Sequence, residues 1–330
     1  MAVFAGREWL PAGPAPGGGL PLRCVSYNVL AQCNIKAAQF AYATPEQLSW
    51  PRRSALLAAE LRALDADVLL LQEIDGYDGE SGWRSALAAL GYASKFQPRT
   101  QAGGARGDGV CIAWRAAALQ LRAGRGVEHN ELATAAAAIG DAAAAARLRN
   151  RDNVGLVVAL APLVAQRGAP ALFLVATTHT YWNPDYEDVK AAQAAHTLRC
   201  VANFAAELAV AAAAAAAPGA PPPPPPLLLG EDFNALPGSL AAAALANAAG
   251  ATEPRLGPLR ALYAGRMPAF TTATQHFSGA IDHLLASRGN VRVLRVLAPP
   301  TRDALGAGLP NATRPSDHLP LAADVVLLAC

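Results

Sequence analysis

Cysteine is scarce in this sequence, and its spacing suits no bridging role. The chain has five cysteines among 330 residues, an odd number with no Cys-x-x-Cys pair. Disulfide frameworks need paired cysteines in an oxidising compartment, and zinc sites need cysteines at close spacing. The sequence therefore predicts reduced thiols in an intracellular protein that has neither kind of site. We expect the cytoplasm as its compartment, with the nucleus or an organelle as alternatives.

Long apolar runs are missing as well. The longest uncharged apolar run, residues 208–217, has ten residues and is mostly alanine, whereas a membrane-spanning helix needs about 20. The hydrophobic content of 53% includes 79 alanines, and the larger apolar residues are only as abundant as in an ordinary globular protein. The first 19 residues carry one arginine before a Pro- and Gly-rich stretch, unlike a secretory signal. We expect no membrane partner.

An excess of charge of either sign is also absent. The 27 Lys and Arg residues nearly balance the 25 Asp and Glu residues, for a net charge of +2. A protein that holds nucleic acid by charge alone has a strongly basic balance. Only three of the cations are lysines, a bias typical of a GC-rich coding sequence. Any nucleic-acid partner must therefore be held by more than charge.

Short β-type runs alternate with Ala- and Leu-rich helical stretches along the chain, which predicts an α/β sandwich of sheets covered by helices. We expect strands at 22–27, 68–71, 110–114, 154–160, 171–177, 227–229, 281–286, 291–297 and 321–328. The expected helices are 51–64, 83–90, 185–210 and 239–248. Residues 1–20 are expected to be a tail and 21–330 one catalytic domain. The Ala- and Pro-rich segment 211–226 is expected to be a solvated loop.

Polar residues follow many of the predicted strands, where α/β proteins place their sites. Taken singly, each such residue more often caps a helix or turns the chain. Together they indicate a shared metal or polar substrate, because burying so many polar groups is otherwise costly. Those that follow a predicted strand are Asn28, Gln72, Glu73, Thr178, His179, Asp232 and Asn234. Asp282 lies near the start of a predicted strand, and Ser316, Asp317 and His318 precede the last one.

The donor atoms of this set indicate a class of metal. Glu73, Asp232, Asn234 and Asp317 offer oxygen, and no cysteine or His-x-x-x-His cluster accompanies them. Hard oxygen ligands suit Mg²⁺, or Mn²⁺ as the alternative, better than zinc. Mg²⁺ held by few carboxylates leaves coordination positions for a substrate phosphate, which points to phosphate-ester hydrolysis.

Seven sequence blocks resemble the endonuclease/exonuclease/phosphatase superfamily and occur in the order that it uses. They are YNVLAQ (27–32), DADVLLLQEID (65–75), GDGVCIAWR (107–115), THTYWNPDYEDVKAAQ (178–193), GEDFNALPGS (230–239), FSGAIDHLLAS (277–287) and PSDHLPLAADV (315–325). The Tyr-Trp-Asn-Pro run after His179 is most similar to the catalytic domain of carbon catabolite repressor-type deadenylases, with nocturnin and Angel proteins as relatives. The resemblance implies a four-layer α/β sandwich, two packed mixed β-sheets flanked by helices.

The resemblance also implies a role for each site residue. Glu73 would ligate one Mg²⁺ beside Asn28, and Asp232 with Asn234 would hold a second ion or orient the attacking water. His179 would stabilise charge on the phosphate. Asp282 would orient His318, and Asp317 and His318 would complete a site for one or two ions. Pro184 and Phe277 would flank an adenine base.

The implied activity is Mg²⁺-dependent 3′→5′ exoribonuclease action on the poly(A) 3′ end of single-stranded RNA in mRNA decay, releasing 5′-AMP. The alternatives are a 2′-5′ or 2′,3′-cyclic phosphodiesterase, a nocturnin-like NADP(H) phosphatase, and a catalytically weak RNA-binding relative. The leucine-rich repeats that dock some deadenylases onto their complex are expected to be absent.

Several residues also have a plainer interpretation. Phe277 could be core, Pro184 a helix start and Trp182 a packing residue, and His129 and His196 are expected at the surface. Glu231 stands where the superfamily has glycine. Strand alternation places Glu231 on the face opposite Asp232, and a carboxylate there is costly if that face is core.

Overall fold

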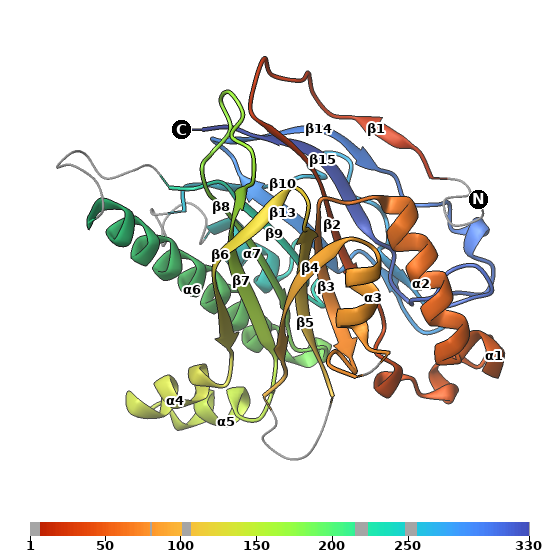
Figure 1. Cartoon of the computed structure of the whole chain (residues 1–330). Helices are drawn as coiled ribbons and strands as arrows, with labels where there is room; N and C mark the ends of the chain where they lie inside the picture. Colours follow the sequence, from red (N-terminus) through yellow and green to blue (C-terminus); the bar gives the residue numbers. More distant parts are fainter. Residues whose placement is uncertain (1–6, 80, 101–106, 215–223, 248–255, 330) are drawn as a thin grey trace.

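The computed structural model describes residues 7–329 except 80, 101–106, 215–223 and 248–255, and it contains two β-sheets packed face to face (Figure 1). The first sheet has the strand order β1 (Trp9–Pro11), β14 (Val291–Leu297), β15 (Leu321–Leu327), β2 (Leu20–Asn28), β3 (Val68–Asp75), β5 (Asp108–Arg115) and β4 (Tyr92–Pro98). The second has the order β10 (Leu259–Ala261), β13 (Asp282–Ser287), β9 (Leu227–Asp232), β8 (Phe173–His179), β7 (Val154–Pro162) and β6 (Leu119–Glu128). A small hairpin pairs β11 (Thr272–Ala273) with β12 (Ser278–Gly279).

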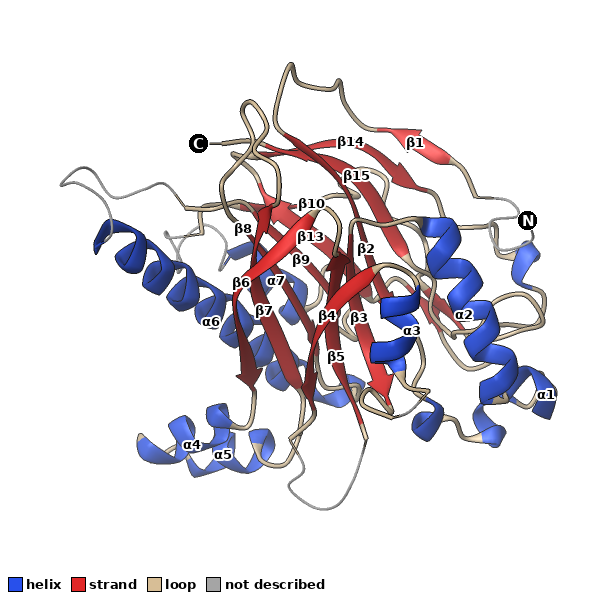
Figure 2. Cartoon of the chain, viewed as in Figure 1, coloured by secondary structure: helices blue, strands red, loops and turns tan. Residues whose placement is uncertain are grey.

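Helices cover the outer faces of both sheets (Figure 2). Packed against the first sheet are α2 (Trp50–Leu64), preceded by α1 (Pro45–Leu48), and α3 (Trp83–Ala89). The second sheet is covered by α6 (Glu187–Ala214) and α7 (Leu240–Asn247). The short helices α4 (Glu131–Ala138) and α5 (Ala142–Leu148) follow β6. The described residues also form 3₁₀ turns at Gln32–Asn34, Ala37–Phe40, Pro184–Tyr186 and Asp303–Leu305.

The two sheets share one apolar core. Alternate residues of β2 and β3, such as Leu22 and Leu70, meet Val158, Val175 and Leu228 from the second sheet, and all of them are buried. Each sheet contains one parallel pair, β2–β3 and β8–β9, and the other neighbours are antiparallel. The sandwich of two mixed sheets flanked by helices is therefore confirmed.

All nine predicted strands are present, with bounds that shift by a few residues. The sequence pattern did not predict β1, β10, β11 and β12, which have only two or three residues each, nor the longer edge strands β4 and β6. Both alternate poorly and are largely accessible, since edge strands need fewer apolar residues than central ones. Within the predicted loop 211–226, α6 extends to Ala214, and residues 215–223 lie outside those described. None of the described helices is both long and apolar enough to span a membrane.

Candidate active site

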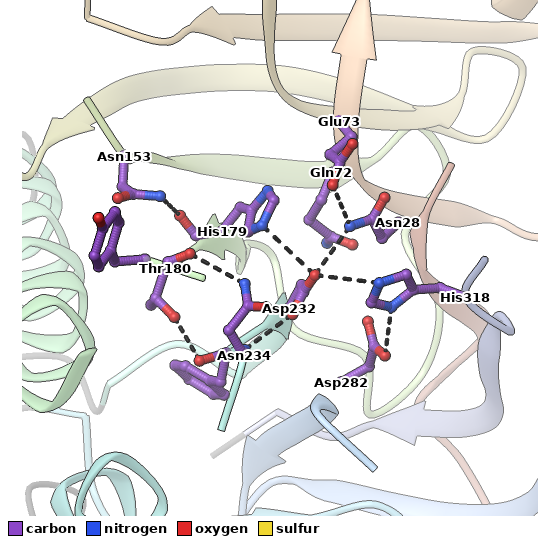
Figure 3. A network of polar contacts seen from close by, with 12 residues as sticks. Asn28, Gln72, Glu73, Asn153, His179, Thr180, Asp232, Asn234, Asp282 and His318 are labelled. Atoms are coloured by element: carbon purple, nitrogen blue, oxygen red, sulfur yellow. Dashed lines mark hydrogen bonds and ion pairs between the residues drawn. The ribbon is translucent and has the colours of Figure 1, made fainter. Parts of the chain in front are cut away.

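The inner face of the second sheet ends in a row of polar residues. Asp232 of β9 pairs with Asp282 of β13 and with His179 of β8. Residues paired across neighbouring strands point to the same face of a sheet. Leu228, on that same face of β9, lies in the core between the sheets. The row of charged and imidazole side chains, labelled in Figure 3, therefore follows the core along the inner face of the second sheet.

The two sheets approach each other closely two residues before Asp232, where Gly230 of β9 faces Ser26 of β2. A Cβ atom on Gly230 would lie 2.7 Å from the Cβ of Ser26 on β2. Such a separation is too short for two carbon atoms, so glycine is required there. The close approach brings Asn28, two residues after Ser26, against Asp232 of the opposite sheet.

Asn28 joins carboxylates from both sheets. Its Nδ2 donates to Glu73 Oε1 at 3.0 Å and to Asp232 Oδ2 at 2.9 Å (Figure 3). The other Glu73 oxygen, Oε2, accepts from the backbone N–H of Ala31 at 3.1 Å and from Nδ2 of Asn34 at 2.8 Å. Because Asn28 holds one oxygen of each carboxylate, Glu73 and Asp232 are drawn to the same point.

A β-bulge directs Glu73 toward the site. The β3–β5 register shifts between Gln72 and Ile74, and Glu73 is the extra residue, with φ of +58°. Strict alternation would point Glu73 away from the inner face that Gln72 occupies. A bulge with a left-handed residue re-aims a side chain at a cost in backbone energy, and both features concentrate at functional sites. Asn234, just after β9, also has a positive φ, of +49°.

His318 forms an ion pair at the site. Its Nδ1 lies 2.9 Å from Asp282 Oδ2, and its Nε2 lies 3.7 Å from Asp232 Oδ2. The Thr271 hydroxyl donates to the same Asp282 oxygen. Burial alone would lower the pKa of His318, but Asp282, Asp232 and Asp317 raise it well above its ordinary value. The structure therefore favours a charged imidazolium at this position.

His179 is oriented by an arginine that sequence reasoning missed. Nη2 of Arg99 lies 3.2 Å from His179 Nδ1, and Nε of Arg99 donates to Asp108 Oδ2 at 2.9 Å. A guanidinium only donates, so Nδ1 of His179 must accept and its proton sits on Nε2. Nε2 lies 3.6 Å from Asp232 Oδ2. Arg99 lies beyond edge strand β4, where no apolar pattern marked the chain.

The segment from His179 to Tyr181 is fixed by side chains from three other parts of the chain. Nδ2 of Asn153 donates to the backbone oxygen of His179 at 2.9 Å, and Nε2 of Gln193 donates to Asn153 Oδ1 at 3.2 Å. Oε1 of Gln193 accepts from the backbone N–H of Tyr181 at 2.8 Å. Nδ2 of Asn234 donates to the backbone oxygen of Thr180 at 3.2 Å, which links this segment to β9.

The donor set fits a divalent cation. Burial would raise the pKa of Glu73, but the amides of Asn34 and Asn28 and the charge of His318 lower it below its ordinary value, so it is ionised. Asp317 Oδ1 is buried without a hydrogen-bond partner among the described residues. Burial raises the pKa of Asp317 to about 6 against the opposing charge of His318, and the negative charges of Glu73 and Asp232 add to the rise. A cation would relieve this repulsion.

Geometry also places Asp282 within a potential metal cluster. One ligand atom from each of Asp232, Asp282 and His318 lies within 4.8 Å of the others. The sequence had assigned Asp282 only to orienting His318. Because His318 is already paired with Asp282, carboxylate oxygens are the more suitable ligands here, and Glu73, Asp232 and Asp317 carry them.

Several plainer interpretations from the sequence are decided by burial. Phe277 is 44% exposed, so it is not core, whereas Pro184 does begin a 3₁₀ turn. The packing role expected for Trp182 was wrong, because this residue is 61% exposed. The surface position expected for His129 and His196 was also wrong. Both are buried, and their Nδ1 atoms lie 3.3 Å apart.

Comparison with known proteins identifies the family of this chain and several of its relatives. The model of the endonuclease/exonuclease/phosphatase family matches residues 25–318. The chain belongs to this family. It is 29% identical over 93% of its length to carbon catabolite repressor protein 4 homolog 4 of Arabidopsis thaliana, and covers 78% of that protein. It is 27% identical over 93% of its length to CCR4-NOT transcription complex subunit 6-like-B of Xenopus laevis, but spans only 64% of that relative.

Two solved structures share the fold. ANGEL2, a 2′,3′-cyclic phosphatase, superposes with a TM-score of 0.75 and 24% identity, with 97% of each chain covered. The human Nocturnin catalytic domain gives a TM-score of 0.67 and 20% identity, with 98% of this chain and 99% of that one covered. At these identities the likeness shows the fold alone. The family and its sequence relatives support a nuclease or phosphodiesterase.

Proposed function

We propose that this protein is a divalent-metal-dependent 3′→5′ exoribonuclease that shortens poly(A) and releases 5′-AMP. The observation that carries the proposal is Phe277, an aromatic side chain 44% exposed on a sequence block shared with Asp282. An accessible ring on the stretch of chain that leads into Asp282 offers a stacking surface to a terminal base. The exposed Pro184 offers a second apolar surface. The similarity in sequence to deadenylase-type relatives favours adenine as that base.

The carboxylates of Glu73, Asp232 and Asp317 would hold Mg²⁺ or Mn²⁺, as one or two ions, with Asn28 fixing the first two. When bound, the cation supplies a Lewis acid for the phosphoryl oxygens. Asp232 and Asn234 orient the attacking water, because the backbone N–H of Asn234 donates to Asp232 Oδ1 at 2.9 Å and leaves Oδ2 facing the site. Water then adds to phosphorus and loses a proton as the bond to the upstream 3′ oxygen breaks, and that oxygen takes up a proton and leaves as a 3′ hydroxyl.

Two imidazoles face the position where negative charge would develop. Nε2–H of His179 is fixed by Arg99 and donates to a non-bridging phosphate oxygen. The imidazolium of His318, anchored by Asp282, supplies a second donor. Such preoriented donors stabilise a transition state because they need no rearrangement during the reaction.

The test is the purified chain with Mg²⁺ and 5′-labelled RNA that ends in A20 or U20. We expect the A20 substrate to shorten one nucleotide at a time with release of 5′-AMP, faster than U20. RNA ending in a 2′,3′-cyclic phosphate and free NADP are included as alternative substrates. Loss of the cyclic phosphate, or phosphate release from NADP, with the A20 tail left intact would replace this proposal by the corresponding phosphatase activity.

Replacing Phe277 by alanine should raise KM for A20 by about 5- to 100-fold, the range expected for loss of one base stack. The preference for A20 over U20 should fall in parallel, because adenine stacks more extensively than uracil. Phe277→Tyr keeps the ring and should behave like the unmodified chain. Steady-state kinetics on both homopolymers check this expectation, and equal losses on A20 and U20 would contradict a role in recognising adenine.

A further inference from the structure

Trp182 is an accessible tryptophan that directly follows the segment His179–Tyr181, and it has no role in the site described above. It is 61% exposed. It follows His179 by three residues, and three residues of extended chain span at most about 10 Å. A large apolar side chain held in water at that distance from a reacting group is a candidate for contact with substrate.

Trp182 belongs to an ordered group of rings. The Tyr181 ring lies 6.0 Å from that of Trp182 and 5.2 Å from that of Tyr186, centroid to centroid. The Arg151 guanidinium lies over both tyrosines, 4.7 Å from each ring centre. We call Tyr181, Trp182, Tyr186 and Arg151 the aromatic strip.

The strip is held at two points, one through the segment His179–Tyr181 and one through α5. The backbone N–H of Tyr181 is held by Gln193, which also binds the Asn153 side chain that supports His179. Nε of Arg151 donates to the backbone oxygen of Arg147 at 2.6 Å. Ordered side chains pay little conformational entropy on binding a ligand, so this surface is preorganised.

Charge on the strip favours an anion. The neighbouring Arg147 is already paired with Asp188 at 2.6 Å. Arg151, in contrast, forms no ion pair within the part of the chain that the structure describes, although it is partly accessible. An exposed tryptophan beside two half-buried tyrosines and an arginine without an acidic partner among the described residues is surface chemistry that binds single-stranded nucleic acid, through base stacking and phosphate contact.

We infer that the aromatic strip is a subsite for the RNA strand upstream of the scissile phosphate. The base of the penultimate nucleotide stacks on Trp182, and Arg151 contacts a backbone phosphate on the same side. This inference rests on the proposed function, because it takes RNA as the substrate. A subsite of this kind also explains how a chain with a net charge of only +2 binds a polyanion, because base stacking contributes binding free energy that does not depend on net charge.

The test measures binding without cleavage. Fluorescence anisotropy of 5′-fluorescein-labelled A20 in EDTA gives Kd for the unmodified chain and for Trp182→Ala. We expect Kd to rise by about 5- to 100-fold in Trp182→Ala and to stay near the original value in Trp182→Phe. Val164→Ala is the matched control, because Val164 is 73% exposed in the loop after β7, at the opposite end of that strand pair from His179.

A second RNA locates the contact on the strand. It is A20 with an abasic sugar at the penultimate position. The unmodified chain should bind this RNA as weakly as Trp182→Ala binds A20, and Trp182→Ala should lose no further affinity. The subsite is overturned if Trp182→Ala binds A20 with the Kd of the unmodified chain, or if the unmodified chain does not bind A20. It is also overturned if Trp182→Ala, compared with the unmodified chain, loses the same factor of affinity for A20 and for the abasic RNA.

Adding Mg²⁺ separates this inference from the proposed function. A chain that needs Trp182 to bind A20 but releases no 5′-AMP would retain the subsite and lose the proposed exonuclease activity. Release of 5′-AMP with the same KM in Trp182→Ala and the unmodified chain would retain the proposed exonuclease activity and overturn the subsite. Equal melting temperatures for the variants exclude misfolding as the cause of any loss.

Discussion

Replacing Asp232 by asparagine, or Glu73 by glutamine, should lower kcat on A20 RNA by several orders of magnitude. Oδ2 of Asp232 accepts from Asn28 and faces both His179 and His318 within 4 Å, so three candidate catalytic groups depend on its charge. Positioned acid–base groups contribute about 10²–10⁴-fold, and loss of a metal ligand adds to that. The amides keep the shape of the carboxylates, so the loss reports on charge. Single-turnover cleavage measures it.

Folding should survive both substitutions, because removing one charge from a cluster of carboxylates relieves repulsion when no cation is bound. Mg²⁺ should raise the melting temperature of the unmodified chain, since a ligand that binds only the folded state stabilises it. Mg²⁺ should raise the melting temperature of Asp232→Asn much less. Asp303→Asn, which changes an exposed carboxylate elsewhere, is the control. Full activity in Asp232→Asn or Glu73→Gln would show that the site is assigned wrongly.

The sequence could predict the members of the site that end apolar strands. Asn28, His179 and Asp232 each follow a buried run, and Asp282 begins one, so strand pattern alone put them at strand ends. That these ends meet depends on the two parallel pairs and on the contact of Gly230 with Ser26. The fold class was predictable for the same reason, because apolar periodicity is a local signal.

The direction of Glu73 could not be predicted in this way. Regular alternation after Gln72 sends its side chain outward, and the bulge that reverses this is set by register with β5, a long-range property. Arg99 illustrates the same limit. Its contact with His179 joins residues 80 apart in sequence, and nothing local to Arg99 signals it. The buried pair of His129 and His196 was likewise invisible to local pattern.

Replacing Glu231 by leucine should stabilise the protein at neutral pH by about 1–3 kcal/mol, the cost typical of a buried polar group left without a partner. Glu231 is fully buried, on the face of β9 that carries Leu229 and packs against the helices, where Phe233 just after the strand also lies. Neither of its carboxylate oxygens has a hydrogen-bond partner among the described residues. Leucine suits this apolar face, whereas glycine would leave a void and cost about 0.5–1 kcal/mol in backbone entropy.

The gain from Glu231→Leu should depend on pH in one direction. Burial raises the pKa of Glu231 well above its ordinary value, and the charge of Asp232 adds to the rise. The folded state therefore binds a proton that the unfolded state releases near pH 4 to 5, so this residue costs stability as pH rises above that range. Thermal melts should show a gain of a few degrees at pH 7 that shrinks toward pH 4.

Two further measurements show whether the charge of Glu231 is the cause. Glu207→Leu, which removes an exposed carboxylate of α6 paired with Arg125, should give no gain, because that pairing lowers the pKa of Glu207. A gain from Glu231→Leu that is equal at all pH values would attribute it to packing instead of charge. The Mg²⁺ dependence of cleavage should stay unchanged, since alternation along β9 points Glu231 away from Asp232. A large shift in Mg²⁺ affinity would mean that Glu231 acts on the metal ligands, and that the two faces of β9 are not independent.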